Sequence, residues 1–261
     1  MPEQKSALAQ IEVRMCSDFA EYQQCVHMQE VVWGSDLVVG TSMFVVAHHT
    51  GGQVIGAFDG NTIVGFTMAL AGVRQGKPFL HSHMTAVLEE YRDRGVGRRL
   101  KLLQRQEALK RGIDLVEWTF DPLELKNAYF NLVRLGAVAR RLIPNCYGVT
   151  DSPLHAGLPT DRFVAEWWLD SDRVKNILAD NPMPPSGPVA RVSLPSNLGE
   201  IKATDREAGA RIQSRAREQF EKYFRSGCVA TSVETQDDTT DYIVEPIAAV
   251  AGLKLPEMPD H

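Results

Sequence analysis

The stretch Arg92–Leu100 reads RDRGVGRRL and lies between a strand-like run and a long helical pattern. Its two glycines, Gly95 and Gly97, let a backbone approach an anion closely. The first turn of the following helix offers unpaired N–H groups where the helix dipole favours negative charge, and the arginines add positive charge. The sequence therefore predicts a phosphate-binding turn here. The alternative is an ordinary capped helix start with a solvated, charged face.

Two well-known phosphate motifs do not fit this turn. The dinucleotide fingerprint G-x-G-x-x-G fails because Leu100 occupies its third glycine position. The Walker pattern fails because no Gly-Lys-Ser/Thr follows. We therefore expect neither a Rossmann-type dinucleotide site nor an ATP P-loop.

Working outward, the residues before the turn show alternating strand-like runs punctuated by Gly, Asp and Asn. Strands are predicted over 11–15, 43–48, 54–58, 62–69 and 80–88. Apolar spacings of three and four predict a helix over 18–33. A second helix is predicted over 95–112, with Val96, Leu100 and Leu103 facing inward, with Arg98, Arg99, Lys101 and Arg105 exposed, and with Gly112 as its stop.

After the turn the chain alternates between strand and helix patterns. We expect strands over 114–120, 137–143 and 162–169, a helix over 125–135 and a short helix whose first turn holds Ser171 and Asp172. A Pro-rich stretch at 182–188 predicts a linker between residues 1–181 and 189–261. The last segment is expected to hold a helix that opens with a capping box, Thr204 to Glu207. The fold class is therefore α/β, a mixed, mostly antiparallel twisted sheet flanked by helices, with a C-terminal α/β extension.

Composition narrows the class of partner. Lys and Arg number 28 against 33 Asp and Glu, a net charge of −5, so no global basic field would attract nucleic acid or a membrane surface. The four cysteines form no C-x-x-C spacing, which argues against a structural zinc site and against a small secreted protein held together by disulfides. The chain shows neither a signal peptide nor the roughly 18 apolar residues that a spanning helix needs. We expect a cytoplasmic protein without a metal.

Arg92, Gly95 and Gly97 fit the signature R/Q-x-x-G-x-G/A, so the chain resembles the GNAT superfamily of coenzyme A-dependent N-acyltransferases. The order of expected elements agrees from about residue 10 to 150. The resemblance implies a catalytic domain at 1–181, with acetyl-CoA or another acyl-CoA as co-substrate. It implies that the turn amides bind the pyrophosphate and that the end of the preceding strand pairs with the pantetheine arm. The cofactor-binding residues would be Thr85, Ala86, Val87, Arg92, Asp93, Arg94, Gly95, Val96, Gly97, Arg98, Asn127 and Asn131.

The segments FLHSHM (79–84), EWTFDPL (117–123) and NLVRLGA (131–137) resemble a subgroup of bacterial predicted acetyltransferases. Some relatives are implicated in acylating amino acids, including succinyl transfer to D-amino acids. The resemblance implies transfer of an acetyl or succinyl group to the amine of a small molecule by direct attack. A non-catalytic coenzyme A sensor or interaction module is the alternative. A homodimer is expected only because symmetric dimers are common.

His81 and His83 lie two residues apart on the strand that leads into the turn, so the period of two predicts that they face one side with Thr85 and Val87. Imidazole titrates near neutral pH and suits a proton acceptor. The arrangement is similar to that in arylalkylamine N-acetyltransferases, whose paired histidines pass the amine proton to solvent. A structural pair, or a metal site completed by a third residue, are the alternatives.

Glu117 is a second candidate base, and could equally bind the substrate ammonium or form an ion pair. Many superfamily members use a tyrosine as general acid where this chain has Leu132. Tyr129, three residues earlier and on nearly the same helical face, is the expected substitute, with Tyr147 as another candidate. Asn127 has a helix cap as its alternative role.

Overall fold

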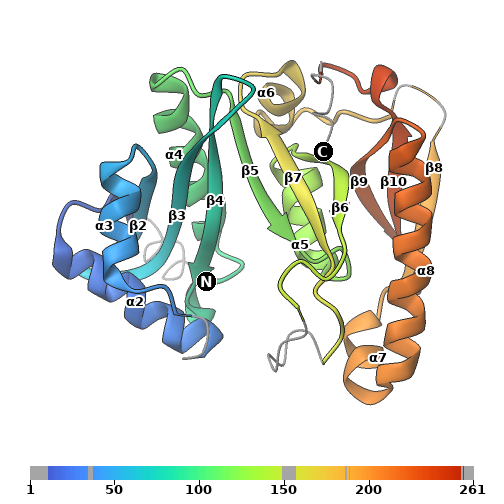
Figure 1. The fold of residues 1–261 in the computed structure, drawn as a ribbon, viewed down its shortest axis with the longest axis horizontal. Coiled ribbons are helices and arrows are strands. Elements are labelled where there is room, and N and C mark those ends of the chain that lie inside the picture. The colour runs from blue at the N-terminus through green and yellow to red at the C-terminus, as the bar shows by residue number, and fades with distance from the viewer. Residues whose placement is uncertain are drawn as a thin grey trace, which may run out of the picture. The chain divides into compact units, whose positions relative to one another are not determined.

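A computed structural model describes residues 11–34, 38–148, 157–185, 187, 189–253 and 255 of the 261-residue chain (Figure 1). Ser186 and Pro188 of the predicted linker lie outside the described residues. The chain divides into two compact units, Met1–Val116 and Glu117–His261.

The first unit is built on four antiparallel strands in the order β1-β2-β3-β4. They span Glu12–Met15 (β1), Gln53–Asp59 (β2), Thr62–Arg74 (β3) and Lys77–Val87 (β4). The hairpin between β3 and β4 turns on Gln75 and Gly76, which both have positive φ, at 49° and 74°. Two such residues give the turn that matches the twist of paired strands.

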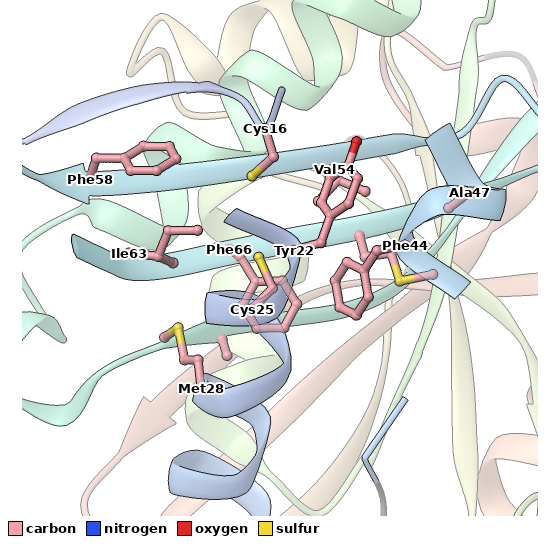
Figure 2. Packing of buried hydrophobic residues seen from close by; sticks show 12 residues of the cluster. Cys16, Tyr22, Cys25, Met28, Phe44, Ala47, Val54, Phe58, Ile63 and Phe66 are labelled. Atoms are coloured by element: carbon pink, nitrogen blue, oxygen red, sulfur yellow. The ribbon is translucent and has the colours of Figure 1, made fainter. Parts of the chain in front are cut away.

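One face of this sheet is covered by α2 (Phe19–Trp33) and α3 (Thr41–His49). The Asp18 side chain accepts a hydrogen bond from the Glu21 amide and starts α2. Figure 2 shows the resulting cluster, in which Tyr22, Cys25 and Phe44 pack against Phe66 and neighbouring strand residues. The strand predicted over 43–48 is wrong, because this segment is α3.

Helix α3 forms despite two consecutive valines because its packing outweighs their preference for strands. Phe44 and Ala47, three residues apart, are both fully buried in the cluster of Figure 2. A strand would have turned these two side chains to opposite faces. The helical spacing buries both.

The opposite face of the sheet is covered by α4 (Val96–Lys110). Val96 and Leu100 pack there against Ile55 and Val64, whereas Val54, the neighbour of Ile55, lies in the other cluster. Gly112, with φ of 70°, follows the helix end as predicted. The predicted exposure of Lys101 is wrong, since its side chain is buried under α4 among polar groups of the sheet.

The second unit contains strands in the order β5-β7-β6-β9-β10-β8, with β5 beginning at the end of the first unit. They span Leu115–Phe120 (β5), Val138–Ile143 (β6), Arg162–Trp168 (β7), Ala190–Pro195 (β8), Cys228–Gln236 (β9) and Thr239–Pro246 (β10). The helices of this unit are α5 (Leu125–Ala128), the π-helix η3 (Tyr129–Arg134), α6 (Asp172–Leu178), α7 (Leu198–Thr204) and α8 (Arg206–Arg225), with a short 3₁₀ turn at Ile247–Ala249 (η4). A 3₁₀ turn of the first unit, Glu89–Tyr91 (η2), follows β4.

Aromatic rings fill the core beneath α8, the long orange helix of Figure 1. Phe163 of β7 meets Phe220 of α8 at 4.6 Å and Tyr242 of β10 at 5.7 Å between ring centres. The Tyr242 hydroxyl donates to the carbonyl oxygen of Pro122 at 2.6 Å. The predicted capping box is wrong by one residue. Asp205 caps α8 by accepting from the Ala208 amide.

The predicted fold class is confirmed. The molecule is mixed α/β, every strand pair with a described register is antiparallel, and helices flank the strands. β6 pairs with β9 at Ala139 and Ala230, so residues on both sides of the predicted linker contribute to the strands of the second unit. The division into 1–181 and 189–261 stays a prediction.

Candidate active site

The turn between β4 and α4 has open space beside its two glycines. Gly95 precedes the helix in the left-handed conformation with φ of 79°, and no side chain of the described residues caps this turn. A Cβ on Gly95 would meet no described atom within 4 Å, and one on Gly97 would meet only Val87 Cγ2 at 3.9 Å. Open space therefore lies beside both glycines at the positive end of a 15-residue helix, while Val96 is buried with 1% exposure. This geometry fits a bound anion.

The arginines around the turn have different roles. Arg92 donates through Nε to the carbonyl oxygen of Val87 at 3.0 Å, which ties the turn to the end of β4. Arg94 and Asp93 are exposed beside it, and Asp93 has a positive φ of 57°. Arg99 instead donates to the carbonyl oxygen of Ile11 at 2.6 Å and holds α4 to the start of β1. Arg92 and Arg94 are therefore better placed than Arg99 to meet an anion.

A β-bulge changes the faces of β4. Met68 pairs with Met84 but Ala69 pairs with Ser82, so His83 is the extra residue of the bulge. His81 pairs with Leu70, which packs with the cluster of α2 and α3, whereas Val87 packs with α4. The prediction that His81 shares a face with Thr85 and Val87 is therefore wrong.

The two histidine rings nevertheless lie near each other, with ring centres 6.3 Å apart and planes tilted by 39°. The His83 side chain is exposed to solvent on one side. Neighbouring protein atoms exclude water from the rest of the ring, and this partial burial lowers the pKa of His83 below the usual 6.5. The His83 imidazole is therefore neutral at pH 7 and able to accept a proton. Within the described ranges no cluster of three or more His, Cys, Asp or Glu side chains could hold a metal ion.

A buried polar chain runs beneath α4 and ends at Thr85. Lys101 Nζ donates to Ser82 Oγ at 2.8 Å and to Gln104 Oε1 at 3.0 Å. Thr67 Oγ1 lies 3.4 Å from Ser82 Oγ and 2.8 Å from Thr85 Oγ1. Burial lowers the pKa of Lys101 to about 7. Helical periodicity did not reveal this position, because the polar partners of Lys101 come from strands remote in sequence.

In the second unit, Glu117 belongs to a buried network of charges. Its Oε1 accepts from Arg141 Nη2 at 2.5 Å, and Arg141 Nε lies 3.5 Å from Glu166 Oε1. Glu166 also accepts from Arg140 Nε at 3.0 Å and from the Trp168 indole at 3.2 Å. The ion pair, one of the roles foreseen for Glu117, is therefore present.

Of the remaining predicted site residues, Asn127 lies on α5, Tyr129 and Asn131 lie on η3, and Tyr147 lies in a turn after β6. Tyr129 is 47% exposed while Leu132 is fully buried, so the expectation that they share a helical face is wrong. The segment Tyr129–Arg134 is a π-helix, whose wider turn shifts residues three apart onto different faces. Asn127 lies inside α5 and does not cap it. It accepts from the buried Asn131 amide at 3.3 Å. Tyr147 bonds to Thr119 at 2.9 Å between oxygens.

The structure thus groups the predicted residues within each unit. In the first unit the end of β4, at Thr85–Val87, and the turn Arg92–Arg98 lie together, joined by the Arg92 hydrogen bond. In the second unit Asn127 and Asn131 are neighbours, whereas Glu117 lies in its own charge network. The sequence analysis missed two features of this region: the burial of Lys101 beneath α4 and the β-bulge at His83.

Comparison with known proteins agrees with this geometry. Residues 17–130 match the family model described as acetyltransferase (GNAT) family. The solved structure of smu.2055 from Streptococcus mutans UA159 is 16% identical with a TM-score of 0.51, covering 61% of this chain and 99% of that one. The NatC complex bound to Gag peptide and CoA is 10% identical with a TM-score of 0.50, covering 60% and 97%. At such identities the likeness shows the fold alone. No curated protein sequence matches significantly.

Among the residues that the structure describes, no helix is both long enough and apolar enough to span a membrane.

Proposed function

Because residues 17–130 match the model of the acetyltransferase (GNAT) family, a family of acyl-CoA-dependent transferases, we propose that this chain transfers an acyl group from acyl-CoA to the amine of a small molecule. Acetyl and succinyl are the acyl groups proposed, and an amino acid is the proposed acceptor. The observation that carries the proposal is the left-handed turn before α4, which has open space beside Gly95 and Gly97 and two exposed arginines, Arg92 and Arg94.

The turn supplies the groups that a pyrophosphate needs. The amides of Val96, Gly97 and Arg98 would donate to phosphate oxygens, and the positive end of α4 would stabilise the charge. The Arg92 guanidinium, held by the Val87 carbonyl, adds a positive charge that does not need to be reoriented. The backbone of Ala86 and Val87 would pair with the pantetheine arm, with Thr85 beside it. When bound, the coenzyme supplies an activated thioester.

On the acceptor side, the chain must remove a proton from an ammonium group. His83 is exposed and neutral at pH 7, so an imidazole nitrogen would take that proton, and His81 at 6.3 Å would pass it onward to solvent. The amine nitrogen then bonds to the thioester carbon and the carbon–sulfur bond breaks with its electron pair on sulfur, while the second proton of the nitrogen passes to solvent. The Leu132 side chain is buried and has no proton to donate, so the leaving thiolate would be protonated by solvent.

The first experiment is thermal unfolding with acetyl-CoA, succinyl-CoA, free coenzyme A and NAD. Ligand at 100 times its Kd stabilises a protein by about 2.7 kcal/mol, which is a shift of several degrees for a chain of this size. We expect shifts with the coenzyme A species and none with NAD. The donor with the largest shift is then used in an amine screen that measures thiol release.

The outcomes of the screen separate two functions. Release of coenzyme A with at least one small amine, abolished by the double substitution His81→Gln and His83→Gln while the thermal shift remains, supports the transferase. Binding without turnover for every amine would instead support a coenzyme A sensor. Absence of any thermal shift would contradict both.

We also propose a cytosolic location. Cys16 and Cys25 are buried thiols, and Cys146 and Cys228 are half-buried thiols. Free thiols persist in a reducing compartment. Protein from freshly lysed cells is unfolded without a reductant, alkylated and analysed by mass spectrometry. All four cysteines should carry the alkyl group, and a disulfide in place of two of them would contradict the proposed location.

A further inference from the structure

A groove runs along the side of α8 where this helix lies over β8. Its volume is about 620 Å³, and its apolar floor includes Leu194 of β8 with Ile212 and Ala216 of α8. In Figure 1 α8 and β8 lie side by side in the second unit, far along the chain from the turn Arg92–Arg98. We call this feature the α8–β8 groove. All of its lining residues belong to the C-terminal segment, to which the proposed reaction assigns no role.

The rim of the groove is positively charged. Arg211 and Arg215 are both exposed there, and the described lining residues include no carboxylate. Arg211 approaches Glu207 at 3.7 Å, but both side chains are more than two-thirds exposed, so this pair is weak. A local basic rim on a chain of net charge −5 favours a negatively charged ligand.

One wall of the groove is the edge of a sheet. β8 pairs with β10 and ends the strand order of the described residues. Edge strands present N–H and C=O groups that can accept an additional strand. An apolar groove beside such an edge is the arrangement by which extended peptides bind through strand addition. Pro195 at the end of β8 limits where a neighbouring strand can continue, since proline has no N–H to donate.

The spacing of the two arginines matches an extended peptide. Residues four apart on a helix are separated by about 6 Å along its axis. Alternate residues of a strand point to one face and are separated by about 6.6 Å. Acidic side chains two residues apart would therefore each meet one arginine. A second copy of this chain fits less well, because a two-fold contact between equal grooves would bring the arginines together.

From these observations we propose that the α8–β8 groove binds an extended, acidic peptide segment of a partner protein. The segment adds as a strand beside β8, and two carboxylates spaced two residues apart pair with Arg211 and Arg215. The interaction is independent of acyl transfer.

Fluorescence anisotropy with synthetic peptides tests the proposal on the full chain. The probe is fluorescein-labelled Thr-Val-Glu-Val-Glu-Val-Thr, and the controls are Thr-Val-Lys-Val-Lys-Val-Thr and the isomer Thr-Val-Val-Glu-Glu-Val-Thr. We expect the probe to bind more tightly than either control and to weaken as salt rises. Arg215→Glu should weaken the probe about tenfold or more. Lys222→Glu makes the same charge change on an exposed position of α8 outside the groove and should change binding less than twofold.

Hydrogen exchange identifies the mode of binding. The probe should protect the backbone amides of β8 that precede Pro195, as a new strand would. Equal binding of all three peptides, or equal loss from both substitutions, would overturn the proposal. Competition by citrate without protection of β8 would show a site for small anions instead. Self-association that Arg215→Glu abolishes would show that a second copy occupies the groove. The latter two results would also overturn it.

Discussion

Replacing Glu166 by glutamine tests the buried charge network that positions Glu117. Glu166 is 2% exposed on its side chain and accepts from Arg140 Nε at 3.0 Å and from the Trp168 indole at 3.2 Å, with Arg141 Nε at 3.5 Å. The substituted side chain would turn an N–H₂ group toward these donors and remove the negative charge that touches both arginines. Losing one to two charge-assisted hydrogen bonds at about 1.5–3 kcal/mol each predicts a cost of about 3 kcal/mol.

The matched control is Glu234→Gln. Glu234 pairs with Arg191 at 2.8 Å, but both side chains are about 40% exposed, and Asp241 remains as a second partner of Arg191 at 3.2 Å. An exposed pair of this kind is worth about 0.2–1 kcal/mol. With a urea m-value of about 2 kcal/mol/M, Glu166→Gln should lower the unfolding midpoint by about 1.5 M and the control by less than 0.5 M. Intrinsic fluorescence reports the transition. Equal shifts for the two variants would refute the reasoning.

Three further predictions concern the turn, the histidine and the cap of α8. Gly95→Ala should cost about 1–2 kcal/mol through its left-handed φ and weaken acetyl-CoA binding in calorimetry, whereas Gly60→Ala, at a φ of 59°, should cost the same and leave binding unchanged. Because burial lowers the pKa of His83, its neutral form is lost only as pH falls through a value below 6.5. The acid limb of kcat/KM should therefore lie below pH 6.5 and disappear in His83→Gln, and a limb above pH 7 would contradict the assignment. Asp205→Ala should lower the free energy of unfolding by about 1 kcal/mol, and Thr204→Ala should lower it by much less. A larger loss for Thr204→Ala would contradict Asp205 as the cap and favour the capping box that begins at Thr204.

Local signals in the sequence predicted the parts of the fold that local geometry determines. The turn before α4 was predictable because Gly95 must adopt a positive φ and because a helix start is a local feature. The stop at Gly112 and the start of α2 at Asp18 follow from the same kind of signal. These elements depend on a few neighbouring residues, so their prediction needed no knowledge of tertiary contacts.

The wrong predictions depend on contacts between remote residues. α3 is a helix because Phe44 and Ala47 both reach one cluster, which the sequence preference of its valines could not reveal. Lys101 is buried because Ser82, from a strand, bonds to it. The bulge at His83 follows from the register with β3, so the period of two assigned the wrong face to His81.

The predicted site residues also differ in how far the sequence could place them, because some depend on local geometry and others on contacts with remote residues. The turn predicted to bind phosphate is one continuous segment, and the structure keeps its glycines and Arg92 together. Glu117 and Tyr129 depend on partners elsewhere in the chain. The ion pair with Arg141 and the π-helix of Tyr129–Arg134 determine their surroundings. Neither arrangement has a signature in the spacing of residues.

The most direct test of the central claim is backbone hydrogen exchange of the full chain with saturating acetyl-CoA and, separately, with NAD. If the first turn of α4 binds the coenzyme pyrophosphate, acetyl-CoA should protect the amides of Val96, Gly97 and Arg98 and NAD should not. Binding of acetyl-CoA with unchanged exchange at these three amides, or equal protection by NAD, would contradict the account.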